Sequence, residues 1–196
     1  MQVQHGVTKT LWRRSPLTND LLQALALLCL YPTSGHKEGF MDGWLLSGIS
    51  INQALCSFNF LNNLPTKSVL TDEMLSQMRL WNTFCLTHLQ YVPPVFLSFF
   101  SLTMESSALG YGRSVNVQQH HLDYCSRILD HPRATPEDGR MVAEIQLYRI
   151  ALKIQHNPQR LRFAEGEYEE IERWKLEWAH LIGKLSLFQI FRRIFC

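Results

Sequence analysis

Apolar residues recur every three or four positions along most of this chain, and that spacing limits the fold more than any other feature of the sequence. Residues at such intervals lie on one face of an α-helix. The clearest example is the stripe Met74, Met78, Trp81, Cys85 and Leu89. No segment alternates apolar and polar residues as a half-buried strand does. The sequence therefore predicts an all-α fold.

We expect an irregular bundle of about six long helices. Residues that cap helix N-termini mark their starts. Asp42 and Thr71 precede two of them, Thr18 or Asn19 precedes the first, and Thr135 stands before Pro136, which suits a first helical turn. The expected helices span residues 18–31, 41–60, 71–91, 117–131, 135–157 and 165–182.

The same spacing identifies side chains that should face the core. Tryptophans on such stripes are interpreted as core packing, with a hydrophobic ligand pocket between the helices as the alternative. The inward positions in the other helices are Trp44, Gly48, Ile51, Leu55 and Phe58, then Leu122, Cys125 and Leu129, then Met141, Ile145, Tyr148 and Leu152, and finally Ile171, Trp174, Trp178 and Leu181.

Composition narrows the class of protein. The 196 residues suit one domain, and 46% hydrophobic residues are enough for a sizeable core. The formal net charge is +2 and is not gathered on one segment, unlike the basic face of a nucleic-acid binder. The N-terminus lacks the apolar core of a signal peptide, and no apolar run reaches the ~20 residues of a membrane span. We expect a soluble protein, cytosolic or nuclear, with no membrane partner.

The cysteines are odd in number and far apart. A disulfide framework favours an even count in a shorter secreted chain, and without a C-x-x-C pair a zinc cluster inside this chain is not expected. We interpret them as small buried hydrophobes in a reducing compartment. They are Cys29, Cys56, Cys85, Cys125 and Cys196.

One short stretch raises the question of a metal site. His120, His121, Asp123 and Cys125 lie close together in the sequence, and His121 and Cys125 could face one metal from a helix. No second ligand pair completes four-coordination. The favoured interpretation is a core cysteine beside surface histidines.

Two other groups of residues raise the question of catalysis. His88 lies one helical turn from Cys85, but no orienting group or oxyanion site is signalled, and His88 is expected at the edge of the packed face. A run of glutamates is interpreted as a solvated helix face. We predict no catalytic, cofactor-binding or metal-binding residue and no enzymatic activity. The glutamates are Glu165, Glu167, Glu169, Glu170, Glu172 and Glu177.

Several phrases together resemble the middle regulatory region of fungal transcription factors that carry a binuclear zinc cluster. An apolar helix, a polar break and a tryptophan-led helix occur in "LQALALLCLYPTSGHKEGFMDGWLLSGISINQAL". The phrase "MRLWNTFCLTHLQY" is similar to the family's arginine-x-tryptophan helix, with Arg79 and Trp81 in those places. The phrase "GYGRSVNV" resembles its glycine-arginine-proline turn, with Ser114 in place of the proline. The next two helices in a subgroup of these regulators are resembled by "LDYCSRILDHPRATPEDGRMVAEIQLYRI" and "IERWKLEWAHLI".

The resemblance implies a nuclear regulatory region that modulates transcription and does not itself contact DNA. Zinc and DNA contact would belong to a domain outside this chain, and no cofactor is expected within it. A small-molecule effector or a protein partner is implied, with a homodimer in the full-length protein. The alternatives are an all-helical interaction scaffold unrelated to transcription and a helical enzyme acting on an apolar substrate.

The resemblance also divides the chain. We expect a flexible N-terminal segment over 1–17, a helical regulatory domain over 18–182 and an atypical tail over 183–196, so that the bundle is incomplete at its C-terminal end. An apolar, proline-bearing insert at 92–105 interrupts the domain. Its residues, and Gly183–Lys184, can be encoded by codons that contain splice signals, so we expect retained intron sequence at both places. The alternatives are a genuine family insertion and a genuine amphipathic C-terminus.

Overall fold

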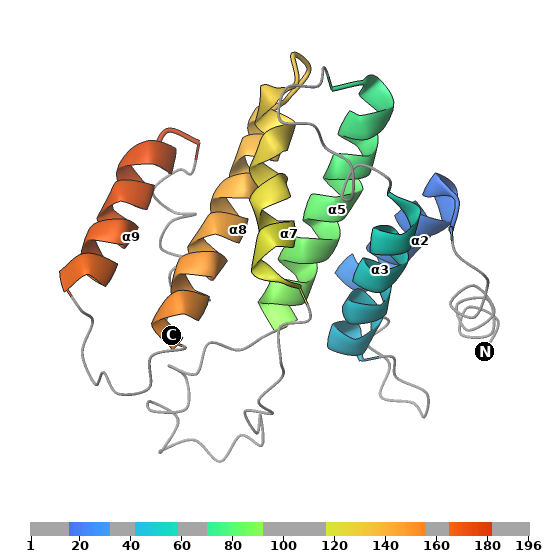
Figure 1. Cartoon of the computed structure of the whole chain (residues 1–196), viewed down its shortest axis with the longest axis horizontal. Coiled ribbons are helices and arrows are strands. Elements are labelled where there is room, and N and C mark those ends of the chain that lie inside the picture. The colour runs from blue at the N-terminus through green and yellow to red at the C-terminus, as the bar shows by residue number, and fades with distance from the viewer. Residues whose placement is uncertain (1–15, 32–41, 59–69, 92–116, 156–164, 182–196) are drawn as a thin grey trace. The chain divides into compact units, whose positions relative to one another are not determined.

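The structure is a computed structural model that describes residues 16–31, 42–58, 70–91, 117–155 and 165–181 (Figure 1). The predicted insert at 92–105 and tail at 183–196 lie outside these residues, as do residues 1–15, and those predictions stand as made. The described chain contains helices and no strand, which confirms the all-α fold. The helices are α2 (Asn19–Leu30), α3 (Gly43–Ser57), α5 (Asp72–Tyr91), α7 (Gln119–Asp123), the 3₁₀ helix η2 (Tyr124–Asp130), α8 (Pro136–Gln155) and α9 (Glu165–Trp178).

The chain forms two compact units, and one boundary between them lies between Ala134 and Thr135. The first unit contains α2, α3, α5, α7 and η2, and the second contains α8 and α9. Each unit is described separately below.

The first unit is built around α5, which contacts α2, α3 and η2. Its predicted stripe is confirmed from Met78 onward, since Met78, Trp81, Cys85 and Leu89 are all buried, while Met74 is half-buried. Trp81 is completely enclosed. Other buried residues of this unit are Leu22, Leu25, Ile51, Ala54, Phe58, Phe84 and Ile128.

Close approach between helices in this unit depends on small residues. Gly43 at the start of α3 faces the ring of Tyr91 at the end of α5, where a Cβ atom would collide with the ring. The Tyr91 hydroxyl in turn donates to the Cys29 carbonyl, 3.3 Å away. The C-terminal turn of α5 is thereby tied to the last turn of α2.

Helix starts follow the predicted caps. The Asp42 carboxylate accepts from the backbone N–H groups of Trp44 and Leu45, and the Thr71 hydroxyl accepts from that of Met74 at 3.2 Å. Thr18 occupies the first cap position without a side-chain cap hydrogen bond.

Thr135 and Asp138 cap each other at the start of α8. The Thr135 N–H donates to the Asp138 carboxylate at 2.8 Å, and the Asp138 N–H lies 3.4 Å from the Thr135 hydroxyl that accepts from it. This is the reciprocal arrangement of a capping box, with aspartate in the acidic position.

The helix predicted over 117–131 is not one continuous α-helix. It begins as the short α7 and continues as the 3₁₀ helix η2. Three residues per turn align Cys125 with Ile128, and both are buried, whereas an α-helical spacing would have pointed Leu129 inward. The prediction for Leu129 is therefore wrong, because Leu129 is 37% exposed.

The second unit packs α8 against α9 through two tryptophans. The indole N–H of Trp174 donates to the Ala143 carbonyl at 2.8 Å, and that of Trp178 donates to the side-chain oxygen of Gln146 at 3.0 Å. Both rings are buried, which confirms their predicted place in the core. The polar edge of each indole thus has a partner on α8.

Candidate functional site

The rings of His120 and His121 lie together with centres 3.9 Å apart, but the described residues do not assemble the suspected metal group. His120 is exposed, while the ring of His121 meets Trp81 edge-on with ring centres 6.0 Å apart. Cys125 is buried, and the thiol next to it is that of Cys85. In the part of the chain that the structure describes, no three His, Cys, Asp or Glu side chains are grouped to hold a metal ion.

Cys85 and His88 do not form a pair. Burial raises the pKa of the Cys85 thiol well above its usual value, and the neighbouring Cys125 thiol adds to the increase. A thiol in this environment is a poor nucleophile because the thiolate is disfavoured.

His88 instead hydrogen-bonds to Ser47 on α3, with Nδ1 2.9 Å from Oγ. It also stacks on Trp44, with ring centres 6.1 Å apart. The expectation that His88 lies at the edge of the packed face is wrong, since its exposed fraction is 0%. Burial lowers its pKa to about 4, against a smaller opposing effect of the Trp44 backbone. A serine–histidine pair enclosed in this way has no room for a substrate, so we interpret it as structural.

The glutamate run is only partly a solvated face. Glu169 is exposed, as predicted. Glu170 reaches across to Lys153 on α8 at 2.7 Å, and Glu172 pairs with Lys175 at 2.6 Å on α9 itself. Glu170 therefore helps to join the two helices of the second unit.

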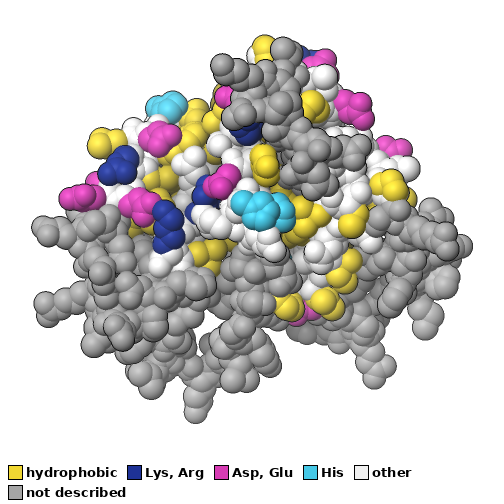
Figure 2. Space-filling view, viewed as in Figure 1, with side chains coloured by type: hydrophobic (Ala, Val, Ile, Leu, Met, Phe, Trp, Pro, Cys, Tyr) yellow, Lys and Arg dark blue, Asp and Glu magenta, His cyan; other side chains and the backbone are white. Residues whose placement is uncertain are grey.

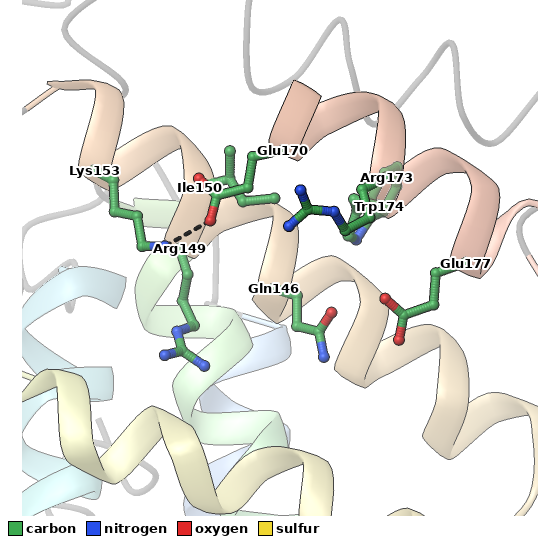
Figure 3. Close-up of a pocket in the computed structure, with 8 residues that line it drawn as sticks. All are labelled: Gln146, Arg149, Ile150, Lys153, Glu170, Arg173, Trp174 and Glu177. Atoms are coloured by element: carbon green, nitrogen blue, oxygen red, sulfur yellow. Dashed lines mark hydrogen bonds and ion pairs between the residues drawn. The ribbon is translucent and has the colours of Figure 1, made fainter. Parts of the chain in front are cut away.

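A surface hollow lies between these two helices, and we call it the α8–α9 hollow (Figure 3). Its volume is about 240 Å³. It is lined by Gln146, Arg149, Ile150, Lys153, Glu170, Arg173, Trp174 and Glu177.

The lining residues of the hollow have the same spacing on α8 and on α9. Each helix contributes residues at positions i, i+3, i+4 and i+7, which share one helix face. On α8 these begin at Gln146, and on α9 they begin at Glu170. Figure 3 shows Glu170, Arg173 and Glu177 reaching from α9 toward α8, while Arg149 extends away from α9.

The lining combines charge of both signs with an apolar floor. Ile150 and Trp174 are buried beneath it. Arg149 and Arg173 bring guanidinium groups, and Glu177 brings a carboxylate at the opposite end of the hollow from the Lys153–Glu170 ion pair. Figure 2 shows acidic and basic side chains intermixed over α9. The arrangement supplies contacts for a small charged ligand.

Sequence reasoning did not find this hollow. It identified the inward stripe of each helix and interpreted the glutamates as solvated. The sequence does carry a signal for it. Next to the inward stripes, α8 has Arg149 and Lys153, and α9 has Glu170, Arg173 and Glu177, at intervals of three or four residues. That the two faces oppose each other follows only from the packing of Trp174 and Trp178.

Comparison with known proteins places the chain in a family. The family model for the middle domain of the transcriptional activator of proteases prtT matches residues 1–196. A transcriptional activator of proteases prtT from Penicillium rubens is 60% identical over 93% of this chain, and the corresponding proteins of Aspergillus oryzae and Aspergillus niger are 52% and 50% identical over 95% and 93% of it.

A more distant relative is an uncharacterized transcriptional regulatory protein of Schizosaccharomyces pombe, which is 25% identical over 91% of this chain. No solved structure matches the chain. The chain spans about a quarter of the length of the curated relatives, 26% for the Penicillium rubens protein. No described helix is long and apolar enough to cross a membrane.

These matches confirm the resemblance to the middle region of a fungal transcription factor. The chain belongs to the family of the prtT-like middle domain, a region of transcriptional activators of proteases.

Proposed function

We propose that this chain acts as the regulatory region of a nuclear transcription factor that controls protease genes. In this role it modulates activation, carries out no reaction and does not itself contact DNA. The observation that carries the proposal is the match of the family model to the whole chain. The net charge of +2, spread along the sequence, supports the absence of DNA contact.

A regulatory region needs a body whose equilibrium between arrangements is shifted by something that binds one of them better. The described helices supply two compact units joined in the sequence at Ala134–Thr135. The joint is held on the side of the first unit, where Arg133 bonds to Asp72 at 2.9 Å and His131 lies 3.6 Å from the same carboxylate. Arg79 also donates to the Arg133 carbonyl at 3.3 Å. The exposed Arg133–Asp72 ion pair is weak enough to break without unfolding a helix.

The test is a domain exchange in Penicillium rubens. The middle domain of the host's prtT protein is replaced by this chain, and transcripts of secreted protease genes are measured under inducing and repressing conditions. We expect regulated transcription to be retained. A second chimera, carrying an unrelated helical domain of equal length, controls for mere spacing between the flanking regions.

A gel-shift titration of this chain alone on protease promoter DNA completes the test. We expect no binding at physiological salt. Sequence-specific binding by the chain alone, or equal regulation by both chimeras, contradicts the proposal.

A further inference from the structure

We propose that Cys85 on α5 and Cys125 on η2 form a site of reversible oxidation, at which hydrogen peroxide converts the two thiols into a disulfide. The two cysteines lie far apart in the sequence, and only the fold brings them together. All the residues involved belong to the first unit, so the bond does not depend on the proposed function.

The contact between the two cysteines rests on the packing of α5 against η2. The Cys85 thiol has the Cys125 thiol as its interacting neighbour, and both are free and buried. Asn82, one turn before Cys85 on the same face of α5, donates its amide to the Cys125 carbonyl at 3.0 Å. A disulfide needs Cβ atoms about 3.5–4.5 Å apart, which small side chains in contact between two helices can approach.

The other cysteines that the structure describes have different surroundings. The Cys29 thiol is buried 3.6 Å from the Ser50 hydroxyl, which cannot join it in a disulfide. Cys56 is exposed on α3. Oxidation of the folded chain should therefore link Cys85 to Cys125 in preference to other pairs.

The two thiols differ in how they become accessible. Cys125 lies in a 3₁₀ helix of seven residues, whose hydrogen bonds have poorer geometry than those of an α-helix. Cys85 is fully enclosed within the 20-residue α5, where burial raises the pKa of its thiol. Local opening of a short segment needs less free energy than opening a central helix. Peroxide should therefore reach Cys125 first.

The chemistry proceeds in two steps that balance. The Cys125 thiolate attacks one oxygen of the peroxide, the O–O bond breaks, and the products are a sulfenic acid and, with the proton that the thiol gave up, water. The Cys85 sulfur then attacks the sulfenic sulfur and loses its proton, and the hydroxyl group leaves as a second water. The thiols are oxidised by two electrons and the peroxide is reduced. The second step is favoured because Cys85 already lies beside its target.

The bond is tested by treating the purified chain with hydrogen peroxide, blocking the remaining thiols by alkylation and mapping the peptides by mass spectrometry without reduction. We expect a Cys85–Cys125 link as the main disulfide, removed by dithiothreitol. The same treatment in concentrated urea is the control, because unfolding removes the contact. There the links should be spread over the five cysteines.

Single substitutions test the order of the two steps. Cys85→Ser should leave a sulfenic acid on Cys125 that dimedone traps, whereas Cys125→Ser should show about tenfold slower trapping on Cys85. Cys29→Ser is the matched control, since it removes a buried cysteine that has a serine as its neighbour, and it should leave the link unchanged. Far-UV circular dichroism checks that each variant folds, and the map of the unsubstituted chain does not depend on the variants.

Amide hydrogen exchange gives an independent measurement on the unsubstituted chain. The disulfide should slow exchange in η2, because it closes the local opening, while exchange in α9 of the second unit stays the same. Three results would overturn the proposal. They are a Cys85–Cys125 link no more abundant in the folded chain than in urea, trapping on Cys85 as fast as on Cys125, and unchanged exchange in η2 after oxidation.

Discussion

Small polar side chains fill the closest contacts inside the first unit. The Ser47 hydroxyl donates to the Trp44 carbonyl at 2.9 Å, and the Ser50 hydroxyl donates to the Leu46 carbonyl at 2.8 Å. Because each hydroxyl is satisfied within its own helix, burying it costs little. Residues that look polar in the sequence can therefore lie in the core of α3, and Ser47 has room to meet His88.

His88 should make stability depend on pH. Its pKa of about 4 in the folded chain lies below the ordinary value of 6.5, so between these limits the unfolded chain binds a proton that the folded chain does not. Stability then falls as the pH is lowered through this window, by at most about 1.4 kcal/mol per pH unit for one proton. Urea unfolding of the wild type and of His88→Gln at a series of pH values measures the difference in slope.

His180→Gln is the control for this experiment, because His180 is exposed. Burial also lowers the pKa of His121, so part of the wild-type slope should persist in His88→Gln. If His88→Gln and the wild type lose stability in parallel on acidification, the buried histidine is not the source.

At the scale of elements, the 3₁₀ helix η2 decides which side chain enters the core. Ile128 is completely buried and Leu129 is 37% exposed. We expect Ile128→Ala to destabilise the chain by about 2–5 kcal/mol and Leu129→Ala by less than about 1 kcal/mol. Thermal or urea unfolding measures both. Equal losses would mean that the segment continues as an α-helix in solution.

Two glycines at helix contacts offer a second comparison. A methyl group at Gly43 would strike the rigid ring of Tyr91, whose hydroxyl is bonded to the Cys29 carbonyl. At Gly139 it would lie 2.6 Å from a terminal methyl of Leu181, which can rotate away. We expect Gly43→Ala to cost about 1–3 kcal/mol. Gly139→Ala should be close to neutral, because alanine favours a helix by about 1 kcal/mol. A stable Gly43→Ala chain in urea unfolding would contradict the close approach of α3 and α5.

The sequence could predict the elements but not every contact between them. Capping residues and 3.6-residue spacing located helices starting at Gly43, Asp72 and Pro136, because both signals are local. The inward position of Ile128 could not be predicted, since the choice of a 3₁₀ helix depends on packing against α5. One such contact comes from Asn82 on α5. Its buried amide donates to the Cys125 carbonyl at 3.0 Å and so holds the backbone of η2 in place. The hollow likewise needed two helix faces that the sequence alone does not bring together.

At the scale of the whole molecule, the two units should lose structure separately. Trp174 is 3% exposed and its indole N–H is bonded to α8, so Trp174→Ala removes a large part of the contact between α8 and α9. We expect amide hydrogen exchange to accelerate in α8 and α9 while α5 keeps its protection. Leu176→Ala on the same helix is the control, because Leu176 is 84% exposed. Equal acceleration in α5 would show that the chain unfolds as one cooperative body.

The placement of Trp174 has a practical consequence. Its indole forms part of the floor of the hollow while its N–H stays bonded inside the second unit. Any occupant would change the polarity and quenching around a fluorophore that the chain already carries. A collection of metabolites could therefore be screened against the unlabelled protein by its own emission, with a Trp174→Phe chain to show which part of the signal comes from this one of the five tryptophans.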